Sequence, residues 1–217
     1  MQEHLLPLFP LGTVLVPQEL LPLHIFEERY KEMIGLCLEA KRAGTGNSEF
    51  GVVQVEDKTI AMLGCTARII NVTRRYPDGR MDILTEGARR FEILLTNEEK
   101  TYLQGAVEYF DDDPGNDSPG DDDVVRATEL FRATIRLLRK SQEIPVHLLP
   151  PYRHLSFRIA GSLPVELALK QELLSIRNEF ERIQRVMEAM IEIIEKLGRV
   201  EKAQRKAGGN GHCTDDD

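Results

Sequence analysis

The chain has 217 residues, of which 41% are hydrophobic and 29% are charged, and its formal net charge is −8. A chain of this size can fold without disulfides or a structural metal, and no apolar run approaches the roughly 18 residues that span a bilayer. Its first residues, MQEH, lack the basic start of a secretory signal. These observations exclude a membrane segment and predict a cytoplasmic, globular protein of one or two domains.

Most of the negative charge lies in two segments. Seven aspartates fall within residues 111–123, and three more, Asp215–Asp217, end the chain. The rest is nearly neutral, and residues 124–207 are only mildly basic, which disfavours nucleic acid as a partner. Runs of Asp with Pro and Gly are typical of solvated, disordered spacers, so we predict a flexible linker over 111–123. Replacing it with a Gly/Ser linker should change the free energy of unfolding by less than about 0.5 kcal/mol.

The cysteines predict neither a metal site nor a cofactor. Cys37, Cys65 and Cys213 are odd in number and far apart, and no histidine lies near them at metal-ligand spacing. Cys37 falls on the apolar stripe of an expected helix that begins at Glu27-Glu28 and ends near Ala40. We therefore interpret it as a small core residue.

Residues 1–110 are predicted to be β-rich, because short apolar runs alternate with turn residues. The turn Pro77-Asp78-Gly79 predicts a hairpin, and the prolines at 7, 10, 17 and 22 require the first strands to be edge-like, bulged or broken. The expected strands cover residues 5–11, 14–16, 21–26, 50–56, 65–76, 81–86, 90–95 and 102–110.

Beyond residue 123 the apolar period changes from two to about 3.6, which predicts helices. We expect helices over 124–140, 152–160 and 164–174, and a last helix whose start is capped by Asn178 with Glu181 three residues later. One unbroken helix from Pro164 onward is the alternative. The predicted domains are a β-rich part (1–110), the acidic linker (111–123), a helical part (124–206) and a disordered tail (207–217).

The last helix carries apolar residues at spacings of three and four, which is a heptad seam that requires a partner helix. The helices over 124–140 and 164–174 are too short to cover all of it once they also pack on the β-rich part. We therefore expect its second half to pair with a second copy or a partner helix, with coverage inside the monomer as the alternative. The residues predicted to associate are Met190, Ile194 and Leu197.

The most specific stretch is LLPLFPLG at 5–12, VLVP at 14–17 and LPLHIFEERY at 21–30. It resembles the opening of the Lon protease N-terminal (LON substrate-binding) domain. Later segments that agree are Phe50-Gly51-Val52, residues 64–69 and 86–91, and Lys170-Gln171-Glu172-Leu173-Leu174. The resemblance covers roughly residues 4–200. It implies an α+β fold, with a PUA-like β-barrel or pseudobarrel followed by an α-helical bundle that ends in a long helix.

The chain departs from full-length Lon in its catalytic motifs. It has no GxxxxGK[ST] phosphate-binding loop, and none of its serines at 48, 118, 141, 156, 162 or 175 lies in a motif that indicates a nucleophile. The other polar candidates, His24, Glu27, Arg29 and Glu86, each have a structural interpretation. His24 alternates with Leu23 and Ile25, for example, and is expected to face solvent. We therefore predict a free-standing form without ATPase or peptidase domains, and no enzyme.

The proline-rich segment from residue 9 to residue 26 cannot form continuous ladders, so some of its apolar residues are candidates to line a groove for an extended polypeptide. The predicted partners are unfolded or hydrophobic segments of proteins, which the chain would engage as an adaptor or chaperone-like factor in proteolysis. An RNA-binding PUA-like module and an unrecognised small hydrolase are the alternatives. The predicted peptide-binding residues are Phe9, Pro10, Pro22, His24, Phe26, Arg29 and Tyr30.

Overall fold

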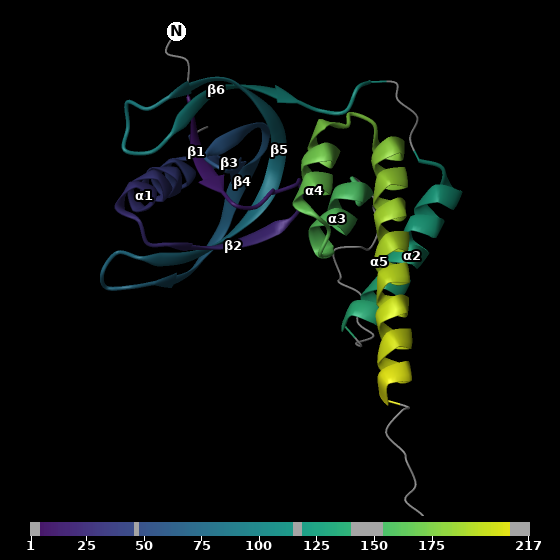
Figure 1. Ribbon diagram of the computed structural model, residues 1–217. Coiled ribbons are helices and arrows are strands. Elements are labelled where there is room, and N and C mark those ends of the chain that lie inside the picture. Colours follow the sequence, from purple (N-terminus) through teal and green to yellow (C-terminus); the bar gives the residue numbers. More distant parts are fainter. Residues whose placement is uncertain (1–4, 46–47, 115–118, 140–153, 209–217) are drawn as a thin grey trace, which may run out of the picture.

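The structure is a computed structural model that describes residues 5–45, 48–114, 119–139 and 154–208 (Figure 1). Strands and one helix form the N-terminal half, and four helices form the described part of the C-terminal half. In chain order the elements are β1 (Leu6–Leu11), β2 (Leu20–Ile25), α1 (Glu28–Ala43), β3 (Glu49–Glu56), β4 (Thr59–Arg75), β5 (Met81–Asn97), β6 (Gln104–Phe110), α2 (Asp121–Arg139), α3 (Leu155–Ser162), α4 (Leu167–Ser175) and α5 (Glu179–Gly208).

Five strands close into a barrel in the order β1–β3–β4–β5–β6, because β6 pairs with both β5 and β1. β1 and β3 are parallel, and the other pairs are antiparallel. β2 lies outside this closed set and, among the described strands, pairs with β5 alone, so it is an edge strand. α3 and α4 lie between the barrel and the α2–α5 pair (Figure 1). The predicted α+β class, a barrel followed by helices ending in a long one, is confirmed.

β5 changes its pairing partner halfway along. Its first half pairs with β2 and its second half, from Arg90, pairs with β6. At the change, the Gly87 N–H donates to the Glu19 carbonyl at 2.9 Å, and the Gly87 carbonyl accepts from the Gln18 N–H at 2.7 Å. A Cβ at position 87 would lie 2.1 Å from the Val16 carbonyl oxygen, so the close approach requires glycine. The two strands predicted over 81–86 and 90–95 are therefore one.

The prolines of the first strands have the predicted effect, but one of the predicted strands is absent from the described structure. The ladder between β1 and β6 has only the two register pairs of Leu6 and Pro7 among the described residues, and β2 carries Pro22 at the sheet edge, which confirms the expected edge-like or broken strands. The strand predicted over 14–16 is wrong, because these residues form no ladder although all three are buried. Their hydrophobicity reflects burial in the core from an irregular segment.

The connection between the last two helices agrees with the main sequence prediction at two points. α4 ends at Ser175 and Ile176 is extended, so the alternative of one unbroken helix from Pro164 is wrong. The Glu181 N–H donates to Asn178 Oδ1 at 3.2 Å, which confirms the predicted cap of α5.

The heptad seam is covered inside the monomer from Ile183 to Met190, whereas Phe180 at its start is exposed. α2 packs along α5 and begins at Asp121, three residues earlier than expected. Ile183, Met187 and Met190 are buried in the core that α2 shares. The prediction that Met190 is left uncovered is wrong, because it is fully buried, whereas Ile194 and Leu197 are half-buried.

One hydrophobic core runs through the barrel and the helices. It joins Phe50 and Ile69 of the barrel to Met33 of α1, Phe131 of α2 and Leu173 of α4. A smaller cluster fills another part of the barrel, consisting of Leu6, Leu8, Val53, Phe91 and Ile93. The shared core means that the helices are anchored on the barrel by burial as well as by polar contacts.

Two glycine substitutions should have opposite effects on stability. Gly87→Ala should lower the free energy of unfolding by about 1–3 kcal/mol, because the new Cβ meets backbone that cannot move aside. Gly35→Ala should raise it by about 0.5–1 kcal/mol, because position 35 is inside α1 and has open space around it. Urea unfolding of both variants checks this. A shift of the same sign in both would contradict the assignment of Gly87 as a steric requirement.

Candidate functional site

The edge strand β2 presents a largely apolar exposed face. Leu20, Pro22, His24 and Phe26, which directly follows the strand, point to solvent, whereas Leu21 and Leu23 are half-buried and Ile25 is buried. The exposed fraction is 53% for Leu20 and 58% for Phe26. We call these four exposed residues the β2 face. At about 3.3 Å per residue it extends for roughly 20 Å, the length of a short extended peptide.

His24 is held in place by polar contacts, and Phe26 stacks on it. His24 Nδ1 lies 2.5 Å from Asp82 Oδ1, and the Tyr76 hydroxyl donates to Asp82 Oδ2 at 2.9 Å. The hydrogen bond from His24, followed by that from Tyr76, holds the pKa of Asp82 below its usual value, so its carboxylate is ionised at neutral pH. The Phe26 ring stacks on His24 with centroids 5.9 Å apart. The exposed aromatic ring therefore rests on an oriented imidazole.

The β2 face is bordered by charge at both ends. In the antiparallel register Pro22 lies opposite Leu84, His24 opposite Asp82, and Leu20 opposite Glu86. Cross-strand partners share a face of the sheet, so Leu84 continues the apolar row while the two acids border it. Among the described strands none pairs with the second edge of β2. The surface can therefore offer apolar contacts together with backbone groups for strand addition.

The structure brings together only part of the predicted peptide-binding set. Pro22, His24 and Phe26 lie on the β2 face. Phe9 and Tyr30 are instead buried, with ring centroids 4.0 Å apart, so their prediction as binding residues is wrong.

Pro10 and Arg29 are not part of the β2 face either. Pro10 is half-buried in β1 opposite Val53 of β3. Arg29 is exposed at the start of α1, where it forms an ion pair with Glu27 and lies over the Tyr30 ring. Sequence reasoning missed Leu20, although its spacing of two residues from Pro22 was a sufficient signal for the shared face.

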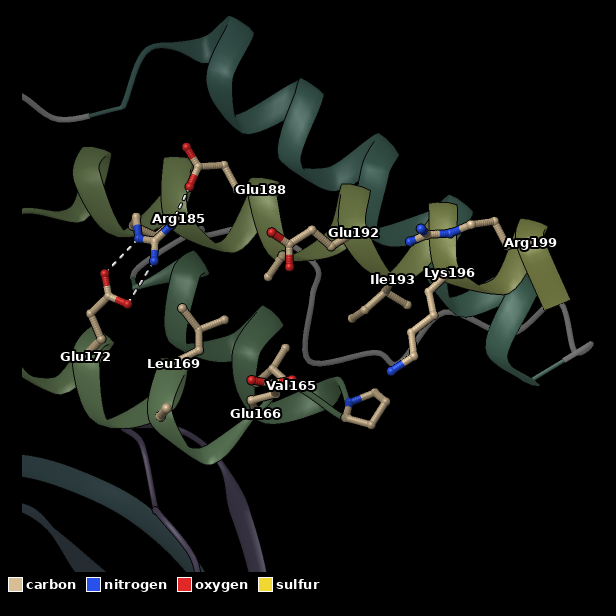
Figure 2. A pocket seen from close by; sticks show the side chains of 13 residues that line it. Val165, Glu166, Leu169, Glu172, Arg185, Glu188, Glu192, Ile193, Lys196 and Arg199 are labelled. Carbon is tan, nitrogen blue, oxygen red and sulfur yellow. Dashed lines mark hydrogen bonds and ion pairs between the residues drawn. The ribbon is translucent and has the colours of Figure 1, made fainter.

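A second candidate site is the groove between α4 and α5, here called the α4–α5 groove, which has a volume of about 540 Å³ (Figure 2). Val165, Leu169 and Ile193 supply apolar lining from the two sides. At one end Arg185 donates to both carboxylate oxygens of Glu172, at 2.7 and 2.9 Å, and also to Glu188. No sequence pattern predicted this groove, because it exists only where α4 and α5 lie side by side.

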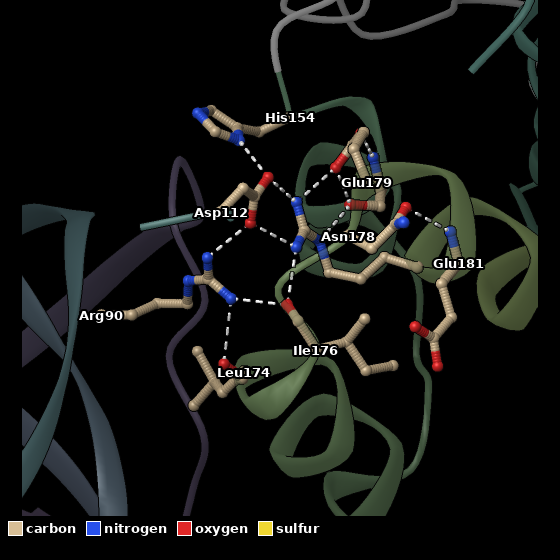
Figure 3. A network of polar contacts seen from close by, with 10 residues as sticks. Arg90, Asp112, His154, Leu174, Ile176, Asn178, Glu179 and Glu181 are labelled. Atoms are coloured by element: carbon tan, nitrogen blue, oxygen red, sulfur yellow. Dashed lines mark hydrogen bonds and ion pairs between the residues drawn. The ribbon is translucent and has the colours of Figure 1, made fainter. Parts of the chain in front are cut away.

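A buried ionic network, the clasp, joins the barrel to the helices (Figure 3). Arg182 of α5 is fully buried and donates to both carboxylate oxygens of Asp112 and to Glu179, each at 2.6 Å. Arg90 of β5 donates to Asp112 at 2.6 Å and to the carbonyl oxygens of Leu174 and Ile176 at 3.1 and 2.6 Å. These contacts couple β5 to the α4–α5 connection.

The clasp contradicts the interpretation of Asp112 as a solvated spacer residue. Burial raises the pKa of Asp112, but hydrogen bonds from Arg182 and the charges of Arg182 and Arg90 outweigh it and hold the pKa below its usual value. Asp121–Asp123 form the first turn of α2, where acidic side chains favour the helix dipole. Residues 115–118 of the predicted linker lie outside the described residues.

The clasp contains the one grouping that resembles a metal site among the described residues. Ligand atoms of Asp112, His154 and Glu179 lie within 4.8 Å of one another. However, Nη2 of Arg182 lies 2.6 Å from both carboxylates. The guanidinium therefore holds the position that a cation would take, and the arrangement is best explained as structural.

Comparison with known proteins places the chain in a family. Its residues 5–192 match the ATP-dependent protease La (LON) substrate-binding domain. A barrel with an edge strand, joined to helices that end in a long one, is thus the fold of a substrate-binding domain. The chain belongs to the LON substrate-binding domain family.

Several relatives are similar to this chain. It is 28% identical to Lon protease 1 of Hydrogenovibrio crunogenus over 70% of this chain and 20% of that protein. It is 28% identical to the Lon protease of Escherichia coli K12 over 92% of this chain and 26% of that protein. The chain thus spans about a quarter or less of these relatives. No helix among the described residues is long and apolar enough to cross a membrane.

Solved structures show the same fold. A Lon N-terminal domain protein from Xanthomonas campestris superposes with a TM-score of 0.63 at 26% identity, covering 84% of this chain and 96% of that chain. The N-terminal domain of Mycobacterium avium complex Lon protease gives a TM-score of 0.61 at 18% identity, covering 86% of this chain and 97% of that chain. The second of these likenesses concerns the fold alone.

Proposed function

We propose that this chain is a non-catalytic module that engages unfolded or hydrophobic segments of proteins along the β2 face. The observation that carries the proposal is the row of exposed Leu20, Pro22 and Phe26 on an edge strand, with Phe26 stacked on the oriented His24. An extended segment can bury its apolar side chains there and add a strand to β2. Membership in a family of substrate-binding domains supports proteins as the kind of partner.

The proposal includes a cellular role for this binding. Recognition of exposed apolar segments suits an adaptor or chaperone-like factor in cytoplasmic proteolysis. Such a factor needs affinity for many sequences, which apolar contacts and backbone pairing provide without reading particular side chains. ATP turnover or peptide hydrolysis by the purified protein would contradict the non-catalytic part of the proposal.

Phe26→Ser should weaken the binding of a labelled, chemically unfolded model protein by about tenfold or more. Burying an aromatic side chain of this size contributes about 1.5–3 kcal/mol, which corresponds to at least a factor of ten in affinity. Fluorescence anisotropy at physiological salt measures it. Val125→Ser is the matched control, because Val125 is 55% exposed on α2, away from β2.

The same assay separates the polypeptide proposal from the RNA alternative. Equal binding by Phe26→Ser and Val125→Ser, or no binding by the wild type, would contradict the assignment of the β2 face. Tighter binding of labelled RNA than of the unfolded protein would favour the RNA-binding alternative, which rests on fold analogy alone.

A further inference from the structure

The α4–α5 groove continues along α5 beyond α4. On α5 the residues that line the groove run from Arg185 to Arg199, about 21 Å at 1.5 Å per residue. On the other wall they cover only residues 164–172, so the α5 wall is the longer one. Val165, Leu169 and Ile193 remain half-buried in it, and the described part of the chain leaves them open to solvent (Figure 2). The groove therefore has the length of a helix segment and a lining in which apolar and charged side chains are mixed.

The charges that line α5 change sign along this groove. Glu188 and Glu192 come before Ile193, and Lys196 and Arg199 come after it. Arg185 is paired with Glu172 and Glu188, so the order of the remaining charges is set by Glu192 before Ile193 and by Lys196 and Arg199 after it. Within the described part of the chain, Glu192, Lys196 and Arg199 form no ion pair, so their charges are available to a partner.

We propose that the α4–α5 groove is a dimer interface, occupied by α5 of a second copy in antiparallel orientation. A face whose charge reverses about its midpoint complements itself under a two-fold rotation, in which contacts are reciprocal. An axis near Ile193 brings Glu192 of each copy opposite Lys196 of the other. The apolar lining is removed from water at the same time. The interface is separate from the β2 face, so it goes beyond the proposed polypeptide binding.

This interface uses a different side of α5 from the heptad seam. Met190 of the seam is buried under α2, and only Ile194 and Leu197 remain half-buried. The groove side carries Glu192, Lys196 and Arg199, which the seam prediction did not consider. Association of the last helix is thus assigned to the side that carries complementary charge.

Single charge reversals followed by mixing provide the test. Glu192→Lys and Lys196→Glu should each weaken self-association by about tenfold, because each places like charges opposite one another twice across the axis. An equal mixture of the two variants pairs opposite charges at both positions, so it should associate at least as tightly as the wild type. Sedimentation of the full chain over micromolar to several hundred micromolar concentrations, at low salt, measures all four samples.

Glu129→Lys is the matched control, since it makes the same charge change at an exposed position of α2 outside the groove. It should associate like the wild type, and circular dichroism should show that all variants are folded. A monomeric wild type throughout the concentration range would overturn the proposal. So would unchanged association of Glu192→Lys, or a mixture that associates no better than the single variants. Binding of an unfolded model protein that Ile193→Glu abolishes, with the wild type monomeric, would instead assign the groove to a polypeptide.

Discussion

Arg182→Met should lower the free energy of unfolding by about 3–5 kcal/mol, because it leaves the carboxylates of Asp112 and Glu179 partly buried without their guanidinium partner. Methionine keeps much of the side-chain volume, so the loss reports the charge contacts more than packing. Urea unfolding at neutral pH measures the effect. The side chains of Asp112 and Glu179 are only 24% and 16% exposed, so water cannot fully replace the lost contacts.

Arg185→Met is the matched control, one turn further along α5. Arg185 forms ion pairs with Glu172 and Glu188, but all three side chains are at least 40% exposed. Exposed pairs contribute about 0–1 kcal/mol, so this variant should lose little stability. Equal losses in the two variants would contradict the assignment of the clasp as the main polar link between the barrel and the helices.

The clasp should also be insensitive to mild acid. The pKa of Asp112 is lowered from its ordinary value of 3.8, and a lowered pKa contributes stability that is present above the ordinary pKa and is lost as the pH falls through the folded-state value. The difference in stability between the wild type and Asp112→Ala should therefore be constant from neutral pH to about pH 5 and shrink only below about pH 4. A Gly/Ser replacement of residues 111–123 should now cost stability through Asp112, contrary to the linker prediction.

Lys170→Met should lower the free energy of unfolding by about 3–5 kcal/mol at neutral pH, as Arg182→Met does, because it leaves Glu19 buried without its cationic partner. Lys170 Nζ lies 2.5 Å from Glu19 Oε1, and the two side chains are only 9% and 12% exposed. The contact joins α4 to the segment that leads into β2. Chemical unfolding of the purified variant measures the loss.

The destabilisation by Lys170→Met should begin to shrink at a higher pH than that by Asp112→Ala, because the pKa of Glu19 is raised whereas that of Asp112 is lowered. Burial raises the pKa of Glu19 above its ordinary value of 4.5 in spite of Lys170, so the folded state binds this proton more readily than the unfolded chain does. Stability from such a group is present below the ordinary pKa and is lost as the pH rises through the folded-state value. Without Lys170 that pKa rises further, and the cost of the substitution should shrink as the pH falls towards 4.5.

The double variant Glu19→Gln, Lys170→Met separates the unpaired charge from lost packing. A neutral amide should restore part of the stability at neutral pH, because no ionised group is then left buried. A double variant that is less stable than Lys170→Met at every pH would show that the carboxylate itself is needed, for example as the acceptor of the Val16 N–H.

Local chemistry made several elements predictable from the sequence. The hairpin at Pro77-Asp78-Gly79, the helix after Glu27 and the Asn178 cap each depend on residues within a few positions of one another. The opening motif and the change of apolar period likewise led to the correct family and fold class, because both patterns lie within continuous stretches of chain. The alternation of residues 20–26 could also have identified the whole β2 face.

Contacts between residues that are far apart in the sequence could not be predicted from it. Asp112 meets Arg182 across 70 positions and Arg90 across 22, so nothing in the Asp-rich segment distinguished it from its solvated neighbours. Phe9 and Tyr30 were assigned to the binding surface because their hydrophobicity is the same in a core as in a groove.

The sequence by itself determined most of the elements, the change from strands to helices, and the family. It did so because propensity, capping and turn chemistry act over a few residues. Only the tertiary structure decided that Met190 is covered by α2, that Gly87 joins two apparent strands into one, and that α4 and α5 enclose a groove. These outcomes depend on which surfaces meet in space. Burial of apolar area is favourable against any well-packed surface, so an apolar pattern in the sequence does not specify its partner.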